Sequence, residues 1–406
     1  MNKSDFFYDL PEELIAQTPL EPRDSSKMMV LSKENDNILH KHFYDVCDYL
    51  NKGDTLILNN TRVLPARIYG VKEETGAIVE FLLLNQLEND VWEALGDRWC
   101  MTEATPEKYL DMVVLDAEKD IEKIASSVDF VFCAVNMSKE ETKALEEKYA
   151  KAECPVVSNN SAFRMAEDVP MVVPELNADH IKIIESQRKR LGTKRGFIAV
   201  KSNCSLQSYV PALFPLHEEY GVKDVLVCTY QAISGAGKTF ERWPEMVDNV
   251  IPFIGGEEEK SEKEPLKLWG KIEDGKIVPA TSPNFTAQCI RVPVSDGHMG
   301  AVFVRFNKKP TKEAMIKAWA DFKGRAQELD LPSAPKQFLH YFEEDNCPQT
   351  KLHRNLENGM AVSIGRLRED SQYDYKFVCL AHNTLRGAAG GAVLLAELLC
   401  AEGYMD

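Results

Sequence analysis

The sequence lacks the long apolar run of a membrane-spanning helix. Such a helix needs about 20 consecutive apolar residues, and no stretch of this chain approaches that length. The opening segment, Met1 to Leu10, has no apolar core and carries acids at Asp5 and Asp9, so it does not have the pattern of a secretory signal. We therefore expect a cytoplasmic protein with no membrane partner.

Paired cysteines are also missing. The 10 cysteines are scattered along the chain, and no two have the two-residue spacing of a zinc ribbon or a thioredoxin motif. We expect reduced thiols and no metal site. Most of these cysteines are interpreted as small core residues.

The chain is short of positive charge. It has 48 Lys and Arg against 64 Asp and Glu, which gives a formal charge of −16. A nucleic-acid binder needs clustered basic side chains for its phosphate contacts, so we expect no nucleic-acid partner. The charge does not argue against a small anionic substrate bound in a local basic pocket. The length of 406 residues predicts two to three domains, and 44% hydrophobic residues is a globular composition.

The pattern of the chain changes near residue 95. Before it, the runs 54–70 and 77–84 are β-prone and separated by turn residues, and the segment holds 9 Lys and Arg against 17 Asp and Glu. After it, short apolar runs alternate with helical patterns, which predicts βαβ units and a parallel sheet. We expect strands at 127–135, 154–158 and 196–201, and helices at 137–150 and 206–220.

Longer β runs follow between residues 223 and 310, ending at Gly300–Phe306. They predict a second domain with a mixed sheet. A strand at 375–380 and an apolar helix at 387–404 are expected to close the chain.

Cys204 is the sharpest chemical feature. It lies between the strand that ends near Lys201 and the helix that starts at Leu206, so it is expected at a helix N-terminus. Unpaired N–H groups and the helix dipole favour a thiolate there, and Asn203 is placed to donate to an oxyanion. The alternative is that Cys204 is a buried cysteine without a chemical role, which is the commoner case for a lone cysteine.

His298 is the best base candidate, because it lies in a polar turn bracketed by glycines just before a strand. Arg291 could bind a carboxylate with both nitrogens of its fork. Glu257 and Lys260 would share one helix face and could hold the two ends of a zwitterion. Taken singly, each has a plain alternative: a hydrogen-bonded turn histidine, a surface ion pair, or a solvated helix face.

The sequence contains neither of two glycine-rich nucleotide-binding motifs in complete form. Gly237-Lys238-Thr239 ends like a P-loop, but the position of the first glycine is Ala232, so the motif fails. A glycine-rich turn whose backbone approaches a ligand is the milder interpretation. The dinucleotide fingerprint G-x-G-x-x-G occurs nowhere in the chain.

From about Gly96 to the end, the chain resembles aspartate-semialdehyde dehydrogenases of the fungal and archaeal-like branch. The matching blocks, in order, are Ser202–Ser205, Gln231–Gly237, Ile251–Glu258, Arg291–His298 and His382–Ala389. The resemblance implies a glyceraldehyde-3-phosphate-dehydrogenase-like fold, an NADP cofactor, and a homodimer or dimer of dimers.

The resemblance also implies roles for single residues. Cys204 would be the nucleophile and His298 the acid/base group. Six residues would serve the substrates aspartate semialdehyde and phosphate: Gln231 at the acyl group, Arg291 at the carboxylate, Glu257 at the amino group, Lys260 and Arg164 at the phosphate, and Asn203 beside the nucleophile. Ser234, Gly235, Gly237 and Asn383 would lie near the nicotinamide half of NADP.

The first 95 residues resemble a different family. Asp9–Ser26 and Gly53–Arg67 are similar to the start of S-adenosylmethionine:tRNA ribosyltransferase-isomerase, an enzyme of queuosine synthesis. The rest of that enzyme is absent. By the same comparison, the dehydrogenase part lacks the opening βαβ half-unit with its glycine-rich pyrophosphate turn.

Together the resemblances imply an α/β and α+β architecture in four parts. These are a β-rich fragment (1–95), a partial Rossmann NADP-binding domain (96–200), a mixed-sheet catalytic and dimerisation domain (201–376), and a strand and helix that return to the NADP domain (377–406). The expected function is NADP-dependent aspartate-semialdehyde dehydrogenase, in lysine, threonine and methionine biosynthesis. The alternative is an impaired chimera that keeps the active-site shell without turnover; tRNA modification is a third hypothesis.

Overall fold

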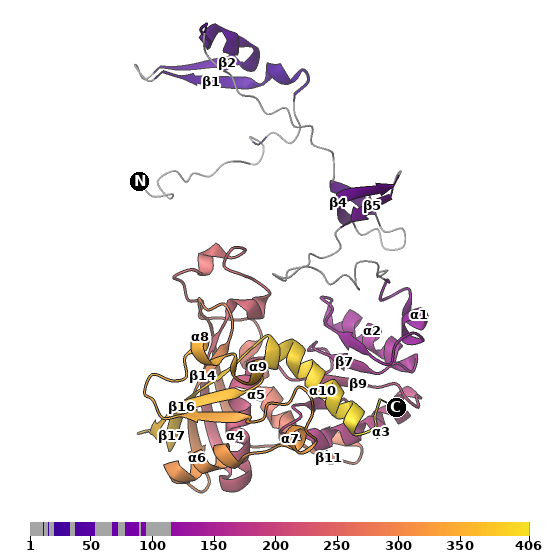
Figure 1. Cartoon of the computed structure of the whole chain (residues 1–406), viewed down its shortest axis with the longest axis vertical. Coiled ribbons are helices and arrows are strands. Elements are labelled where there is room, and N and C mark those ends of the chain that lie inside the picture. The colour runs from indigo at the N-terminus through magenta and orange to yellow at the C-terminus, as the bar shows by residue number, and fades with distance from the viewer. Residues whose placement is uncertain are drawn as a thin grey trace. The chain divides into compact units, whose positions relative to one another are not determined.

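The computed structural model describes residues 115–405 without interruption. Before them it describes residues 11, 15, 20–32 and 37–52, and the backbone of three strands between 67 and 94. The chain divides into two compact units, Met1–Met112 and Val113–Asp406 (Figure 1). The predicted β run over 54–66 and the predicted change of family after residue 95 lie outside the described residues.

The described parts of the first unit are mostly β-strands. β1 (Lys27–Leu31) pairs antiparallel with β2 (Ile38–His42), and the 3-10 turns η3 (Arg23–Ser25) and η4 (Phe43–Tyr49) flank this hairpin. A second antiparallel sheet has the order β3-β4-β5. Its strands are β3 (Arg67–Val71), β4 (Ile78–Glu88) and β5 (Val91–Ala94). The predicted β-rich character of this segment is confirmed where it is described.

The second unit begins with the predicted parallel sheet, whose order is β6-β7-β9-β8. The strands are β6 (Val131–Cys133), β7 (Val156–Ser158), β8 (Met171–Val172) and β9 (Ile198–Lys201). β6 is shorter than the predicted run over 127–135, because its ladder with β7 involves three residues on each strand. The surrounding helices are α1 (Ile121–Ala125), α2 (Lys139–Lys151), η6 (Ala178–Ile183) and α3 (Ile184–Leu191).

The start of α2 shows how local sequence sets an element. Ser138 accepts a hydrogen bond from the Glu141 backbone N–H, and the Glu141 carboxylate accepts one from the Ser138 N–H. This reciprocal capping box satisfies two N–H groups that would otherwise lack partners at the helix start. The predicted helix and its cap are therefore confirmed.

A six-stranded mixed sheet follows, in the order β13-β10-β14-β17-β16-β15. Its strands are β10 (Val222–Gln231), β13 (Asn284–Arg291), β14 (His298–Phe306), β15 (Leu339–Phe342), β16 (Val362–Glu369) and β17 (Tyr375–Ala381). β10 runs parallel to β13 and antiparallel to β14. A small hairpin, β11 (Lys271–Glu273) and β12 (Lys276–Val278), lies apart from it.

One face of this sheet is covered by helices. α4 (Leu206–Tyr220) contacts β14, β16 and β17, and α6 (Lys312–Asp321) contacts β15. Alternate residues of β14 are buried. The short elements η7 (Ile233–Ala236), η8 (Pro244–Met246), α7 (Arg325–Glu328), α8 (Thr350–His353) and α9 (Leu356–Gly359) connect the strands, and α5 (Glu257–Leu268) packs on β13.

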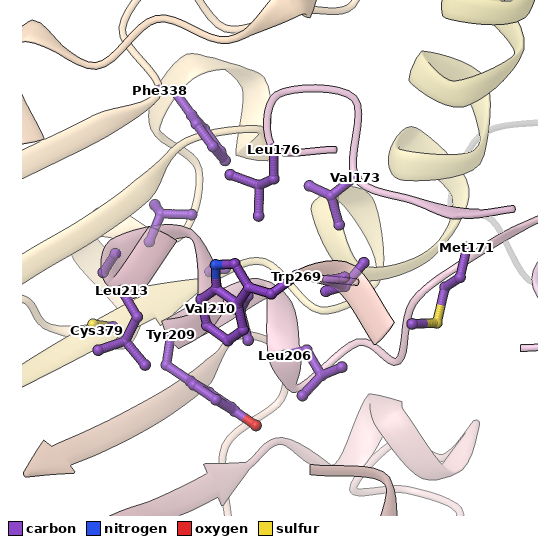
Figure 2. Packing of buried hydrophobic residues seen from close by; sticks show 14 of the residues in the cluster. Met171, Val173, Leu176, Leu206, Tyr209, Val210, Leu213, Trp269, Phe338 and Cys379 are labelled. Carbon is purple, nitrogen blue, oxygen red and sulfur yellow. The ribbon is translucent and has the colours of Figure 1, made fainter. Parts of the chain in front are cut away.

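The core of the second unit forms around α4. Figure 2 shows its Leu206, Tyr209, Val210 and Leu213 in one cluster with Trp269. All four α4 side chains are at most 1% exposed. Full burial of such a side chain stabilises the fold by about 2 kcal/mol. α4 is thus held firmly, and so is the turn that precedes it.

The chain ends with a π-helical turn, η9 (Leu385–Ala389), followed by α10 (Gly390–Ala401). α10 contacts β7 and β9 of the parallel sheet (Figure 1). The predicted strand and apolar helix at the end of the chain are confirmed. No helix among the described residues is both long and apolar enough to span a bilayer.

Candidate active site

Cys204 lies where the sequence predicts it, in the turn between β9 and α4. This is the carboxyl end of a parallel strand, where α/β proteins bind their ligands. The Asn203 Oδ1 atom shapes the turn by accepting hydrogen bonds from the Ser205 backbone N–H at 2.8 Å and the Ser205 hydroxyl at 2.7 Å. Cys204 keeps partial exposure while both of its neighbours are buried.

His298 faces Cys204. It is the first residue of β14 and is fully buried, and its Nε2 atom lies 3.6 Å from the Cys204 Sγ atom. The Ala232 backbone N–H donates to His298 Nδ1 at 3.0 Å, which places the ring proton on Nε2, toward the sulfur. Burial, then the charge of Arg291, lowers the pKa of His298 to about 3. The ring is therefore neutral at pH 7.

The sulfur itself is a thiol in the ligand-free chain. Burial raises the pKa of Cys204 and Glu257 raises it further, while Lys201, Arg164 and Arg291 lower it only in part. Burial therefore outweighs the stabilisation of a thiolate that is expected at the helix N-terminus. The proton has to leave when an electrophile arrives.

Glu257 forms the centre of a polar network beside Cys204. Its carboxylate accepts two hydrogen bonds from Asn203 Nδ2, at 3.0 and 3.1 Å, and one from Gln231 Nε2 at 3.3 Å. Lys260 Nζ forms an ion pair with it at 2.8 Å. Burial raises the pKa of Glu257, but Lys260, Asn203 and Gln231 outweigh it, so the net pKa is below the usual value. The structure thus holds a buried anionic carboxylate here.

Arg291 reaches the same place from the end of β13. Its Nη1 atom donates to the Ala232 carbonyl oxygen at 2.6 Å, and the residue is 6% exposed. Gly235 packs against it: a Cβ atom at this glycine would lie 3.0 Å from Arg291 Nη1 and from His298 Nε2. A side chain at Gly235 would therefore crowd both groups, which would have to give by a few tenths of an ångström.

Arg164 joins the site through a residue that sequence reasoning missed. Its Nη1 atom donates to Glu264 Oε1 at 3.1 Å, and Glu264 Oε2 accepts from the Asn203 backbone N–H at 2.7 Å. The Arg164 Nε atom is buried and has no hydrogen-bond partner in the described part of the chain. An unpaired guanidinium N–H beside the nucleophile turn suits an anionic ligand.

The residues predicted to bind the cofactor lie close to one another in the structure. Asn383 Nδ2 donates to Ser234 Oγ at 2.9 Å, and Asn383 Oδ1 accepts from the Gly297 backbone N–H at 2.7 Å, next to His298. Gly237 has φ +66°, a conformation that favours glycine, and a Cβ atom there would meet nothing within 4 Å. All 12 residues singled out in the sequence thus fall in one connected region.

Sequence reasoning missed three groups of this region. The Ala232 N–H fixes the histidine ring, Glu264 bridges Arg164 to the nucleophile turn, and Gly387 of η9 lies so close that a Cβ atom there would be 2.8 Å from Cys204 Cβ. Glu264 could have been found, because it lies seven residues after Glu257 on one helix. The other two depend on backbone contacts. No cluster that could hold a metal ion occurs among the described residues.

The chain is similar to known aspartate-semialdehyde dehydrogenases. Aspartate-semialdehyde dehydrogenase of Methanothermobacter thermautotrophicus is 40% identical over 303 residues, which cover 74% of this chain and 85% of the relative. The enzyme of Archaeoglobus fulgidus is 42% identical over 294 residues, 71% of this chain and 83% of the relative. The chain belongs to the aspartate-semialdehyde dehydrogenase family. This is a family of oxidoreductases, as the sequence predicts.

Solved structures agree with this assignment. An aspartate-semialdehyde dehydrogenase with NADP from Candida albicans has a TM-score of 0.68 and 36% identity, over 75% of this chain and 86% of that one. The Vibrio cholerae enzyme II complexed with ASA has a TM-score of 0.53 and 26% identity, over 69% of this chain and 81% of that one. The predicted glyceraldehyde-3-phosphate-dehydrogenase-like fold is confirmed.

Two family descriptions match parts of the chain. "Semialdehyde dehydrogenase, dimerisation domain" covers residues 213–386. "Queuosine biosynthesis protein" covers residues 3–158, which confirms the second resemblance and extends past the predicted boundary near residue 95. Membership of the aspartate-semialdehyde dehydrogenase family therefore coexists with an unrelated N-terminal segment.

Proposed function

We propose that this chain interconverts aspartate semialdehyde and aspartyl phosphate with phosphate and NADP. The observation that carries the proposal is the pairing of Cys204 with His298 at 3.6 Å, beside the buried Glu257 carboxylate. Family membership supports it. The product would enter lysine, threonine and methionine biosynthesis.

The substrate is held by opposite charges in this proposal. Arg291, buried next to His298, binds the substrate carboxylate, and Glu257 binds the ammonium group. These two contacts would direct the aldehyde carbon toward the Cys204 sulfur. Gln231, held by Glu257, then lies where it can orient the acyl group.

The chemistry proceeds through a covalent intermediate. The Cys204 sulfur adds to the aldehyde carbon while His298 Nε2 gives its proton to the carbonyl oxygen and takes up the proton that the sulfur releases, so the ring stays neutral. This gives a hemithioacetal. Loss of the hydroxyl proton to solvent and of a hydride to the nicotinamide would then leave a thioester. Phosphate held by Arg164 and Lys260 attacks the thioester carbonyl, the C–S bond breaks, and aspartyl phosphate departs with Cys204 restored.

The residues fit the nicotinamide half of NADP. Gly235 presents bare backbone next to His298, and Ser234 and Asn383 form a polar pair beside it. The chemistry that NADP supplies when bound is acceptance of the hydride. The pyrophosphate half has no G-x-G-x-x-G turn in this sequence, so we expect weaker cofactor binding than a complete Rossmann unit provides.

A homodimer is part of the proposal. The family description for residues 213–386 is a dimerisation domain. Helices cover one face of the mixed sheet, and the other face carries the half-buried Met299 and Phe303 and the exposed Tyr230. An apolar sheet face of this kind is typical of a subunit interface.

The test is phosphate-dependent NADPH formation from aspartate semialdehyde by the full chain. We expect turnover that Cys204→Ala abolishes, with Cys228→Ala as the matched control because Cys228 lies on β10 outside this network. Absence of turnover, with Cys204 still alkylated by iodoacetamide, would instead identify the impaired chimera.

A further inference from the structure

Arg386 is a buried arginine of η9, directly before Gly387. The residue is 1% exposed, and its guanidinium carbon lies 4.5 Å from the centre of the Phe338 ring. Its Nη1 and Nη2 atoms donate to the two carboxylate oxygens of Glu175 at 2.5 and 2.6 Å. Glu175 is also buried and follows β8, 211 positions earlier in the chain. The ion pair therefore fixes η9 to the parallel-sheet part of the second unit.

A third nitrogen of Arg386 connects it to the nucleophile turn. Its Nε atom donates to Gln207 Oε1 at 3.0 Å, and Gln207 Nε2 donates to Ser202 Oγ at 2.7 Å. A guanidinium has donors and no acceptor, so it takes the oxygen end of the Gln207 amide and leaves the NH₂ end for Ser202. Ser202 and Gln207 lie on either side of Cys204 in the chain, so their hydrogen bond spans the turn that carries the cysteine.

η9 also touches this turn through its backbone. A Cβ atom at Gly387 would lie 2.8 Å from Cys204 Cβ and 3.1 Å from Cys204 Cα. Because Gly387 directly follows Arg386, whatever fixes Arg386 also fixes the backbone that packs against the nucleophile. Two routes therefore lead from Arg386 to Cys204, one through the Gln207 side chain and one through Gly387.

Stability alone is a weak reason for this arrangement. A buried ion pair gains little over apolar residues of the same volume, because the cost of desolvation offsets the attraction. What the guanidinium adds is direction, since its planar set of donors fixes the angles at which Glu175 and Gln207 approach it. Such a connection suits a place where a small displacement of the backbone matters.

We infer that Arg386 and Gln207 are positioning residues that hold the turn of Cys204 at its distance from His298. The inference rests on the proposed function, which makes Cys204 the nucleophile. Both residues act through the backbone of the turn and of η9. None of the hydrogen bonds in this chain of contacts involves Arg291, the proposed partner of the substrate carboxylate. We therefore expect an effect on kcat and not on KM.

Steady-state kinetics of the full chain separates these two effects. Gln207→Met keeps the length of the side chain and removes both of its hydrogen bonds, and Ser202→Ala removes one of them. Arg386→Lys keeps a charge for Glu175 but has no Nε–H for Gln207. We expect each variant to lower kcat about tenfold, since one connection of several is lost, and to leave the KM for aspartate semialdehyde unchanged.

Two further variants make the test specific. Gln207→Met combined with Ser202→Ala should be no slower than Gln207→Met alone, because both substitutions break the same connection. Ser261→Ala is the matched control for Ser202→Ala and should keep the wild-type kcat. Ser261 is a fully buried serine of α5, and its hydroxyl lies 3.7 Å from the Cys289 thiol. A wild-type kcat in Arg386→Lys or Gln207→Met, multiplied losses in the double variant, or an equal loss in Ser261→Ala would overturn the inference.

Hydrogen exchange gives a measurement that does not depend on turnover. The backbone amides of residues 202–207 should exchange about tenfold faster in Gln207→Met than in the wild type, while those of α6 exchange at the same rate. Unchanged exchange at 202–207, or equally faster exchange in α6, would also overturn the inference. The proposed function fails separately: a wild type without turnover, in which Gln207→Met still speeds exchange at 202–207 alone, removes the dehydrogenase and leaves the connection from Arg386 to the turn standing.

Discussion

The proton between Cys204 and His298 is controlled by one backbone hydrogen bond. Because the Ala232 N–H occupies His298 Nδ1, the neutral ring carries its proton on Nε2 and points it at the reaction site. In an imidazolium the Nδ1 atom would also carry a proton, and this N–H would face the Ala232 N–H. His298 is thus prepared to give a proton to a developing oxyanion, which is the direction that aldehyde addition requires.

The buried neutral histidine should also make stability depend on pH. The pKa of His298 is about 3 in the folded chain and about 6.5 when unfolded. Between these values the unfolded chain binds a proton that the folded chain does not, so stability falls as the pH drops, by up to about 1.4 kcal/mol per pH unit. Urea unfolding at pH 7, 5.5 and 4.5 should show a shallower decline for His298→Asn. Parallel declines would contradict this.

Gly235 gives a steric test at the same scale. A methyl group in Gly235→Ala would lie 3.0 Å from Arg291 Nη1 and His298 Nε2, so both side chains must shift. Because these two side chains must give by a few tenths of an ångström, we expect kcat/KM for aspartate semialdehyde to fall about tenfold. Gly255→Ala is the control, because its Cβ atom would meet nothing within 4 Å. Similar losses in both variants would count against the site.

At the scale of elements, α5 assembles much of the pocket from one helical stripe. Glu257, Lys260, Glu264 and Lys267 are spaced by three or four residues, so they share a face. The first two form an ion pair with each other, and Glu264 holds both Arg164 and the Asn203 N–H. One rigid element therefore sets the distance between the proposed phosphate and thiol groups.

Glu264→Gln should loosen this connection. Glutamine has one acceptor oxygen, so its amide NH₂ would face either Arg164 or the Asn203 N–H. We expect the KM for phosphate to rise and kcat to fall, each about tenfold, with the fold retained. Steady-state kinetics measures both. Glu259→Gln on the same helix is the control and should behave as the wild type, because Glu259 pairs only with the exposed Lys263. Changes of similar size in kcat and KM in this control would refute the assignment.

The π-helical turn η9 supports the nucleophile from behind. Gly387→Ala would place a Cβ atom 2.8 Å from Cys204 Cβ, closer than real side chains approach. We expect slower alkylation of Cys204 and a kcat reduced at least tenfold. Ala389→Ser, at an exposed position of the same turn, is the matched control. An unchanged rate of Cys204 alkylation in Gly387→Ala would contradict this prediction, because it would mean that the turn shifts to accommodate the added methyl group.

At the scale of the whole molecule, the mixed sheet is expected to pair with a second copy. Light scattering should give a mass near 92 kDa, twice the 45.8 kDa of the chain. Phe303→Glu puts a charge on the sheet face opposite the helices and should yield monomers. Phe132→Glu, at the 48% exposed Phe132 of the parallel sheet, should leave the dimer intact. A monomeric wild type would contradict this arrangement.

Much of the fold followed from local patterns in the sequence. Two features were predictable because each depends on residues close in the chain. They are the limits of α4, at Leu206 and Tyr220, and the capping box at Ser138. The family could also be predicted from the five blocks that resemble it, and the residues chosen as site candidates lie close together in the structure. Strand lengths were less predictable, since the three-residue β6 is limited by its partner β7.

Only the tertiary structure decided how the site residues act. The sequence determined that a cysteine would sit at a strand-to-helix turn, but burial and the Glu257 charge decided that it rests as a thiol. It likewise indicated His298 but not its tautomer, which the backbone of Ala232 sets from 66 positions away. Electrostatic roles depend on desolvation and on partners distant in the chain, and these exist only once the chain has folded.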